Sequence, residues 1–260
     1  MIFSKGNSNT LLFLLMGLSS SIAFSTNQPN NFLHSAFDVK QYTPLVTFTV
    51  GPDFVRAGQA QTLTLLSPFQ NHYTNNSATA TVTDGGVFLG VERVLTDYFS
   101  VQLGVAGYVD AKLSPGGDVW QFAVPLFDTL SYSYNIHHSR VMFSSKLLTI
   151  VPGYQAIHPY FSWELGTAYN RANSYQETPL TPLAVPMTPF ANHTQSSFAW
   201  GLGVGVDYNF NQHIRGGIGY QFADLGAVSL GVTPAASTTQ TLSLSHLYTN
   251  QLRFQITFLV

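Results

Sequence analysis

The sequence contains no cysteine, which excludes disulfide bonds and any metal site built on thiolate ligands. Charge is also scarce: only 8% of the residues are Asp, Glu, Lys or Arg, against about 25% in ordinary globular proteins. The net charge is −2, and lysine and arginine form no cluster. Because a nucleic-acid-binding protein needs a basic surface, we expect no nucleic-acid partner.

Long apolar runs are missing as well, although 45% of the residues are hydrophobic. No internal run approaches the ~20 residues that a membrane-spanning helix needs. The 20 phenylalanines and 13 tyrosines are instead spread through segments in which apolar and polar residues alternate. This distribution favours strands over helices.

The clearest alternation lies in residues 197–224, SFAWGLGVGVDYNFNQHIRGGIGYQFAD. Large apolar side chains occupy every second position, and Gly and polar residues lie between them. Successive side chains of a strand point to opposite faces. An unbroken apolar face opposite a small, polar face is typical of a transmembrane β-barrel, whose outer face contacts lipid.

The amino terminus has the pattern of a secretory signal peptide. Lys5 precedes the apolar run 11–18, and small residues at 21 and 23 form a cleavage site. We expect a signal peptide at 1–23, an N-terminal periplasmic segment at 24–43 and a barrel domain at 44–260. A signal peptide followed by barrel strands indicates the outer membrane of a Gram-negative bacterium.

Eight segments alternate in this way, which predicts an all-β fold: a transmembrane, antiparallel, up-and-down β-barrel of eight strands. The expected strands are Pro44–Val55, Gly85–Leu95, Phe99–Val109, Leu130–Ile150, Pro159–Arg171, Ser197–Phe210, Ile214–Leu225 and Ser245–Leu259.

The connections between these segments alternate between short and long. Residues 96–98, 151–158 and 211–213 are short, and four connections are long: Arg56–Asp84, Asp110–Thr129, Ala172–Ser196 and Gly226–Leu244. Outer-membrane barrels have short periplasmic turns and long extracellular loops. Both termini are therefore expected in the periplasm, and the long loops are expected to contain turn residues and little else.

A ten-stranded barrel is the alternative. Residues 119–126 alternate weakly, and the phase of the segment Leu130–Ile150 slips around residues 136–140. A turn at His137-His138 would divide that segment into two strands. Ten strands would destroy the alternation of short and long connections, so we expect eight strands with a β-bulge near His138.

Three segments carry a resemblance to a known family: PYFSWELGTAYNRA (Pro159–Ala172), FAWGLGVGVDYNFNQHIRGGIGYQF (Phe198–Phe222) and LRFQITF (Leu252–Phe258). The chain resembles the eight-stranded outer-membrane β-barrels related to the membrane domain of outer-membrane protein A and to opacity-type surface proteins. The resemblance implies outer-membrane lipids, including lipopolysaccharide, as surroundings. It also implies the barrel assembly machinery as a partner, which an aromatic residue near the C-terminus helps to engage.

The interior of an eight-stranded barrel is only wide enough for side chains to fill it. Alternation places five charged residues on the inner face, as candidates for ion pairs in the barrel interior: Glu92, Glu164, Asp207, Arg215 and Arg253. Gln102, Gln221 and Gln255 are expected on the same face. Because unpaired buried charge is costly, we expect a network of ion pairs that plugs the lumen. A gated ion path through the same residues is the alternative.

His137 and His138 are expected to face opposite sides of a strand, so they do not bind one metal ion together. His137 and Ser139 have the spacing of the His-x-Ser sequence of outer-membrane lipid A 3-O-deacylases. Such a triad also needs an acid that orients the His, and the first acid after Ser139 is Glu164. One third of the triad is thus missing, so we expect no catalytic, cofactor or metal site.

The expected function is a structural or surface-interaction role through the four long loops, which present binding residues on a rigid scaffold to host or other surface ligands. A narrow, porin-like channel for ions or small solutes is the alternative, and a lipid A-modifying enzyme is the third hypothesis.

Overall fold

The computed structural model describes residues 42–76, 79–234 and 238–260. The expected signal peptide, 1–23, and residues 24–41 of the expected periplasmic segment lie outside the described residues. No helix in these ranges is long and apolar enough to cross a membrane.

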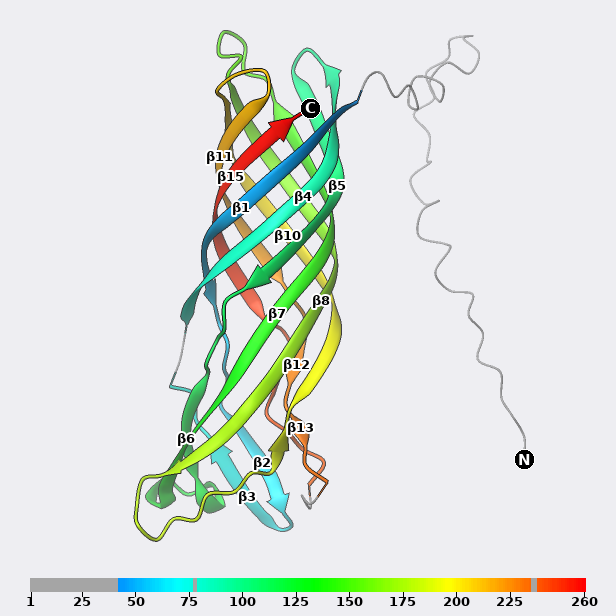
Figure 1. The fold of residues 1–260 in the computed structure, drawn as a ribbon. Helices are drawn as coiled ribbons and strands as arrows, with labels where there is room; N and C mark the ends of the chain where they lie inside the picture. The colour runs from blue at the N-terminus through cyan, green and yellow to red at the C-terminus, as the bar shows by residue number, and fades with distance from the viewer. Residues whose placement is uncertain (1–41, 77–78, 235–237) are drawn as a thin grey trace, which may run out of the picture. The chain divides into compact units, whose positions relative to one another are not determined.

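Eight antiparallel strands close into one barrel, as the sequence predicts (Figure 1). Each strand pairs with the next, and the last pairs with the first. In order around the ring they are β1 (Thr43–Val55), β4 (Ala80–Thr96), β5 (Phe99–Asp110), β7 (Asp128–Thr149), β8 (Ile157–Pro179), β10 (His193–Asn209), β11 (Ile214–Asp224) and β15 (Tyr248–Leu259).

The short connections all lie at the end of the barrel that carries the C-terminus, and the long connections lie at the other end, which we call the loop end (Figure 1). The strands β7 and β8 have 22 and 23 residues, although a tilted strand needs only about 9–11 to cross a bilayer. Both strands therefore continue well beyond the bilayer toward the loop end.

The β-bulge expected near His138 is wrong, and the turn of the ten-stranded alternative is not formed. His137 and His138 lie within β7 and pair with Arg171 and Asn170 of β8 without interruption. The register shifts further along, between Ser133 and Asn135. On the β8 side of this shift Ser174 has a φ of 56°, so the irregularity belongs to β8.

The same alternate residues of β7 face the interior along its whole length. The inner face is polar in one part of the strand and apolar in the other, and the outer face changes in the opposite sense. From residue 138 to 146 the inner face carries His138, Arg140, Ser144 and Lys146, whereas the outer face carries Val141 and Phe143. Between residues 130 and 136 the inner face is apolar and buried, and the outer residues are Ser and Asn. We call residues 138–149 of β7, and the parts of the other strands level with them, the membrane section. The remainder toward the loop end is the outer section.

The outer section has a hydrophobic core of its own, because its outer face contacts water and its apolar side chains must be buried inside. Strands β7 and β8 contribute Leu130, Tyr132, Tyr134, Ile136 and Ala172, and the long connections contribute Leu63, Tyr73, Leu113, Val119, Phe190, Leu230, Leu242 and Leu247.

The long connections are therefore not simple turns, contrary to the expectation. They form β2 (Gln61–Leu66), β3 (Phe69–Tyr73), β6 (Gly116–Trp120), β9 (Phe190–Ala191), β12 (Val228–Ser229), β13 (Gly231–Val232), β14 (Ser243–Leu244) and the 3-10 turns η2 (Gln121–Ala123) and η3 (Pro125–Phe127). Of the weakly alternating residues 119–126, only two belong to a strand, because the chain turns through η2 and η3 immediately after β6.

Candidate functional site

The lumen of the membrane section contains all five charged residues that the sequence places on the inner face. Their side chains are buried, and they come from five different strands: Glu92, Glu164, Asp207, Arg215 and Arg253. The expected inner-face glutamines lie among them. Together these residues form three hydrogen-bonded groups that cross the lumen.

The first group joins Arg215 to Glu92. The two guanidinium NH groups donate to the two carboxylate oxygens at 2.8 and 3.2 Å. Gln102 Nε2 donates to Glu92 Oε2 at 2.7 Å, and Arg215 Nε donates to Asn209 Oδ1 at 2.7 Å. Both charges are thus hydrogen-bonded on more than one side, as burial of an ion pair requires.

The second group surrounds Glu164. Its carboxylate accepts hydrogen bonds from the Tyr108 hydroxyl at 2.7 Å and from Gln221 Nε2 at 2.7 Å. The Arg253 NH1 lies 3.4 Å from the same carboxylate. The ring of Tyr108 lies beneath the guanidinium groups of both Arg253 and Arg140, at 4.5 and 4.4 Å from the ring centre. Such cation–π contacts add to the ion pair.

The third group joins Asp207 to Lys146, a residue that the sequence analysis missed. Lys146 Nζ donates to Asp207 Oδ2 at 2.7 Å and to Gln255 Oε1 at 3.0 Å, and it lies 3.8 Å from the ring centre of Tyr160. The spacing of Lys146 from Arg140 and Ser144 in steps of two is the signal that predicts its inner-face position.

A further charged cluster lies at the boundary with the outer section, and the sequence analysis missed it too. Arg140 NH2 donates to Asp84 Oδ2 at 2.9 Å and to Gln251 Oε1 at 3.0 Å. Asp110 and His138 lie beside it. Asp84 and Glu92 are separated by an even number of residues on β4, so the same alternation could have identified Asp84.

Little free space remains between these groups. A void of about 30 Å³ lies among Tyr108, Lys146, Tyr160, Glu164 and Arg253. That volume is enough for on the order of two water molecules. Polar side chains therefore fill most of this part of the lumen.

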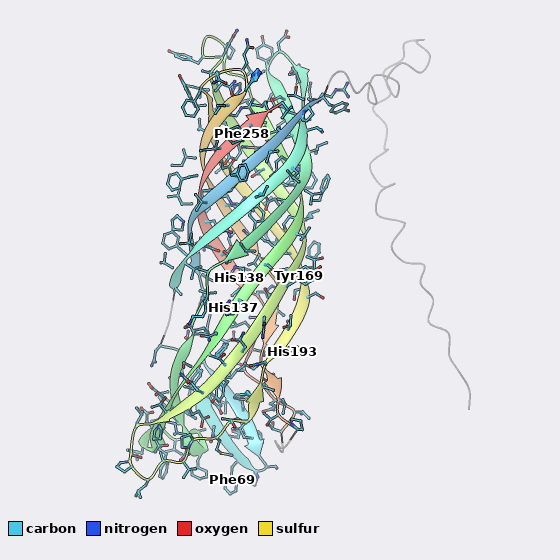
Figure 2. The ribbon with its side chains drawn as sticks, in the orientation of Figure 1. Phe69, His137, His138, Tyr169, His193 and Phe258 are labelled. Carbon is cyan, nitrogen blue, oxygen red and sulfur yellow. The ribbon has the colours of Figure 1, made fainter. Side chains whose placement is uncertain are left out.

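The residues of the deacylase hypothesis do not come together. Figure 2 shows the neighbours His137 and His138 midway along β7. His137 is exposed and Ser139 shares its outer face, whereas the carboxylate of Glu164 lies on the inner face. An acid on the opposite side of the barrel wall does not orient the His137 ring.

The loop end carries exposed apolar side chains, with Phe69 at the extremity opposite to Phe258 (Figure 2). The ring of Phe122 contacts the rings of Phe69 and Phe127 edge to face, at 5.5 and 5.8 Å between ring centres. Leu126 beside them is 92% exposed. We call these four residues the aromatic cluster.

The backbone beneath the aromatic cluster is strained. Phe122 and Ala123 have φ values of 57° and 55°. Residues other than Gly rarely adopt this left-handed backbone conformation. The Asn71 side chain accepts a hydrogen bond from the Phe122 backbone N–H at 3.3 Å. Strain of this kind is often found at binding sites.

The proline-rich loop, residues 180–189, starts beside the same region. The Leu180 N–H donates to the Thr129 carbonyl at 2.8 Å, and Leu183 is 94% exposed. Glu177 holds the far part of the loop, because its carboxylate accepts hydrogen bonds from the Tyr175 hydroxyl at 2.6 Å and from the Met187 N–H at 2.7 Å. Burial raises the pKa of Glu177, and these two hydrogen bonds oppose the shift.

Residues 62–249 match the family model described as the outer membrane protein beta-barrel domain. The chain belongs to this family. The barrel is therefore a protein of the bacterial outer membrane. No curated protein sequence matches the chain.

Several solved outer-membrane barrels resemble this one in structure. Neisserial surface protein A is 10% identical, with 83% of this chain and 96% of that protein covered and a TM-score of 0.40. OprG from Pseudomonas aeruginosa is 14% identical, with 84% and 97% covered and a TM-score of 0.42. The protease OmpT from Escherichia coli is 7% identical, with 84% and 97% covered and a TM-score of 0.43. At such low identity, the chemistry of these proteins does not transfer to this outer-membrane barrel.

Proposed function

We propose that this outer-membrane barrel is a surface-contact protein whose loop end binds apolar partner surfaces outside the cell. The membrane section is its scaffold, with both termini in the periplasm and the loop end outside. The exposed aromatic cluster on a folded outer section is the observation that carries the proposal. The role is a non-enzymatic one.

The chemistry of the loop end supports an apolar partner. Contiguous exposed apolar side chains on a soluble surface mark sites of protein or membrane interaction. Such side chains belong to the aromatic cluster and to Leu180, Leu183, Val185 and Met187 of the proline-rich loop. Neither segment contains lysine or arginine. Attraction to an anionic partner is therefore not the basis of the contact.

The filled lumen favours this role over that of a channel. Three groups of charged side chains cross the membrane section, and the void between them is about 30 Å³. A porin-like path would require these buried ion pairs to separate, and separation leaves uncompensated charge. The narrow channel therefore remains the second hypothesis.

Two further partners follow from the outer surface of the barrel. Its exposed apolar band, which includes Phe143, Trp163 and Phe254, fits the hydrocarbon of outer-membrane lipids such as lipopolysaccharide. Phe258, near the end of β15, is the aromatic residue proposed to engage the barrel assembly machinery.

Adhesion of intact bacteria to a phosphatidylcholine-coated surface tests the surface-contact role. Bacteria that display the protein should bind more than bacteria without it, and sodium chloride should not reduce binding. The double variant Leu126→Ser/Leu183→Ser should lose most of the added adhesion.

The matched control is Tyr154→Ser, which removes an exposed apolar side chain (66% exposed) from the opposite end of the barrel. It should adhere as the wild type does. Equal adhesion with and without the protein, or undiminished adhesion of the double variant at equal surface expression, would overturn the proposal.

A further inference from the structure

The charged cluster at the boundary with the outer section also contains Asp53. This cluster is independent of the proposed contact at the loop end. Asp53 is near the end of β1, Asp110 ends β5, and His138 lies on β7. Asp53 is 0% exposed, and the side chains of Asp110 and His138 are also 0% exposed. Three strands thus bring two carboxylates and one imidazole together out of contact with water.

The three side chains converge on one point. One ligand atom from each lies within 4.8 Å of the others. The closest approach is 2.6 Å, between His138 Nε2 and Asp110 Oδ2, yet neither atom makes a hydrogen bond of acceptable geometry. Asp53 Oδ1 and Asp110 Oδ1 make no hydrogen bond of acceptable geometry either. Buried polar atoms normally have a hydrogen-bond partner, so these atoms are available to bind a further group.

The charge around these atoms indicates which kind of ligand they would bind. Three carboxylates, Asp53, Asp84 and Asp110, surround one guanidinium, that of Arg140. Three negative charges against one positive charge leave −2 when His138 is neutral. The nearby Arg253 forms its ion pair with Glu164, in the neighbouring group. Uncompensated charge of this size is very unfavourable in a dry interior, and one divalent cation cancels it.

We propose that Asp53, Asp110 and His138 form a binding site for a divalent transition-metal ion of the zinc class. Zinc is bound by imidazole nitrogen and carboxylate oxygen in proteins, whereas magnesium and calcium prefer oxygen alone. Gln251 orients the first ligand, because its Nε2 donates to Asp53 Oδ2 at 3.0 Å. Its Oε1 accepts from Arg140, which links the site to the ion pair with Asp84.

The role of the site is structural. Strands β1 and β5 both end within two residues of their metal ligand, at Val55 and Asp110, and the outer section begins there. A metal ion shared by β1, β5 and β7 would hold the ends of β1 and β5 against β7, which continues through the boundary. A metal ion that binds the folded barrel but not the unfolded chain stabilises the folded state.

Refolding with and without zinc tests the site, because buried ligands are accessible while the barrel folds. The purified protein is treated with chelator in urea and refolded into detergent with ZnSO₄ alone, and bound metal is counted by mass spectrometry after gel filtration. We expect one zinc ion per chain and a higher unfolding temperature. Refolding with Co²⁺ should give the visible absorption bands of cobalt bound by nitrogen and oxygen.

The neighbouring histidines provide a matched pair of variants. His138→Gln should weaken zinc binding at least about tenfold and abolish the cobalt bands. His137→Gln, on the exposed outer face, should change neither. Asp53→Asn is the second site variant and should behave as His138→Gln does. The heat-dependent shift of the folded band on a detergent gel selects protein that has folded.

Two results would overturn the proposal. One is wild-type protein that folds with less than one zinc ion per chain at saturating zinc, which would mean that a proton shared by Asp53 and Asp110 satisfies the cluster. The other is folded His138→Gln or Asp53→Asn protein that binds zinc as tightly as the wild type.

Discussion

Arg215 on β11 binds Glu92 on β4 through two hydrogen bonds, although β1 and β15 lie between these strands in the ring. The pair therefore spans the lumen instead of following the barrel wall. It holds together strands that do not contact each other through their backbones. The ion pair thus links opposite parts of the barrel wall, and its removal should lower the stability of the barrel.

Arg215→Ala should destabilise the barrel by about 3–5 kcal/mol, because it leaves Glu92 charged, buried and unpaired. Urea unfolding in lipid vesicles measures this change. The double variant Glu92→Gln/Arg215→Gln should lose less stability than Arg215→Ala, since no buried charge remains. Equal stability of Arg215→Ala and the wild type would show that the pair does not stabilise the barrel.

The wild-type protein should be electrically silent in a planar bilayer, because charged side chains occupy the lumen. Single-channel recording under symmetric potassium chloride measures this. Steady conductance of the wild type that changes with Lys146→Ala would favour the narrow channel instead.

Ile136→Ala should destabilise the outer section by about 2–5 kcal/mol, as for other large-to-small substitutions in a core. Ile136 is fully buried in the outer core, whereas its neighbour His137 is exposed. The control His137→Ala should change stability by less than about 0.5 kcal/mol. Protease cleavage of the long loops on intact cells, faster only for Ile136→Ala, is the readout.

The attachment of the proline-rich loop to Glu177 should weaken as pH rises. Burial raises the pKa of Glu177 above its usual value of 4.5. The folded state thus favours the protonated carboxyl, and its contribution to stability is complete below pH 4.5 and is lost as pH rises through the raised pKa. Hydrogen exchange at residues 180–187, corrected for its intrinsic pH dependence, should reveal this loss.

Glu177→Gln is the control, since an amide does not titrate. Its loop should show the same protection at all pH values. Better protection of the wild-type loop as pH rises from 4.5 to 7 would contradict the prediction, because the two hydrogen bonds to the carboxylate would then outweigh its burial.

Alternation of apolar and polar residues was sufficient to predict the eight strands, the three short turns and the inner face of residues such as Glu164 and Asp207. It could not predict their partners. Lys146 and Asp207 are 61 residues apart, and Glu92 and Arg215 are 123 apart. Such pairings depend on the closure and shear of the ring, which a local pattern does not contain.

The error on β7 has a different physical cause. Alternation specifies two faces but not the medium that each face contacts. Residues 130–136 and 138–146 keep the same inner phase, but the outer medium changes from water to lipid between them. If lipid is assumed throughout, this inversion resembles a slip in phase, and a bulge is wrongly expected at His138.

The proposed role depends most on one feature: β7 passes from lipid to water near Ser139, with the loop end outside the cell. Because the chain has no cysteine, single cysteines provide a direct test with a membrane-impermeant maleimide on intact cells. Cysteine at outer-face positions 133, 135 and 137 should be labelled, whereas cysteine at 143, 147 and 212 should not. Labelling at 143 or 147 would show that these positions do not face lipid. Labelling at 212 without labelling at 133, 135 and 137 would show that the loop end faces the periplasm.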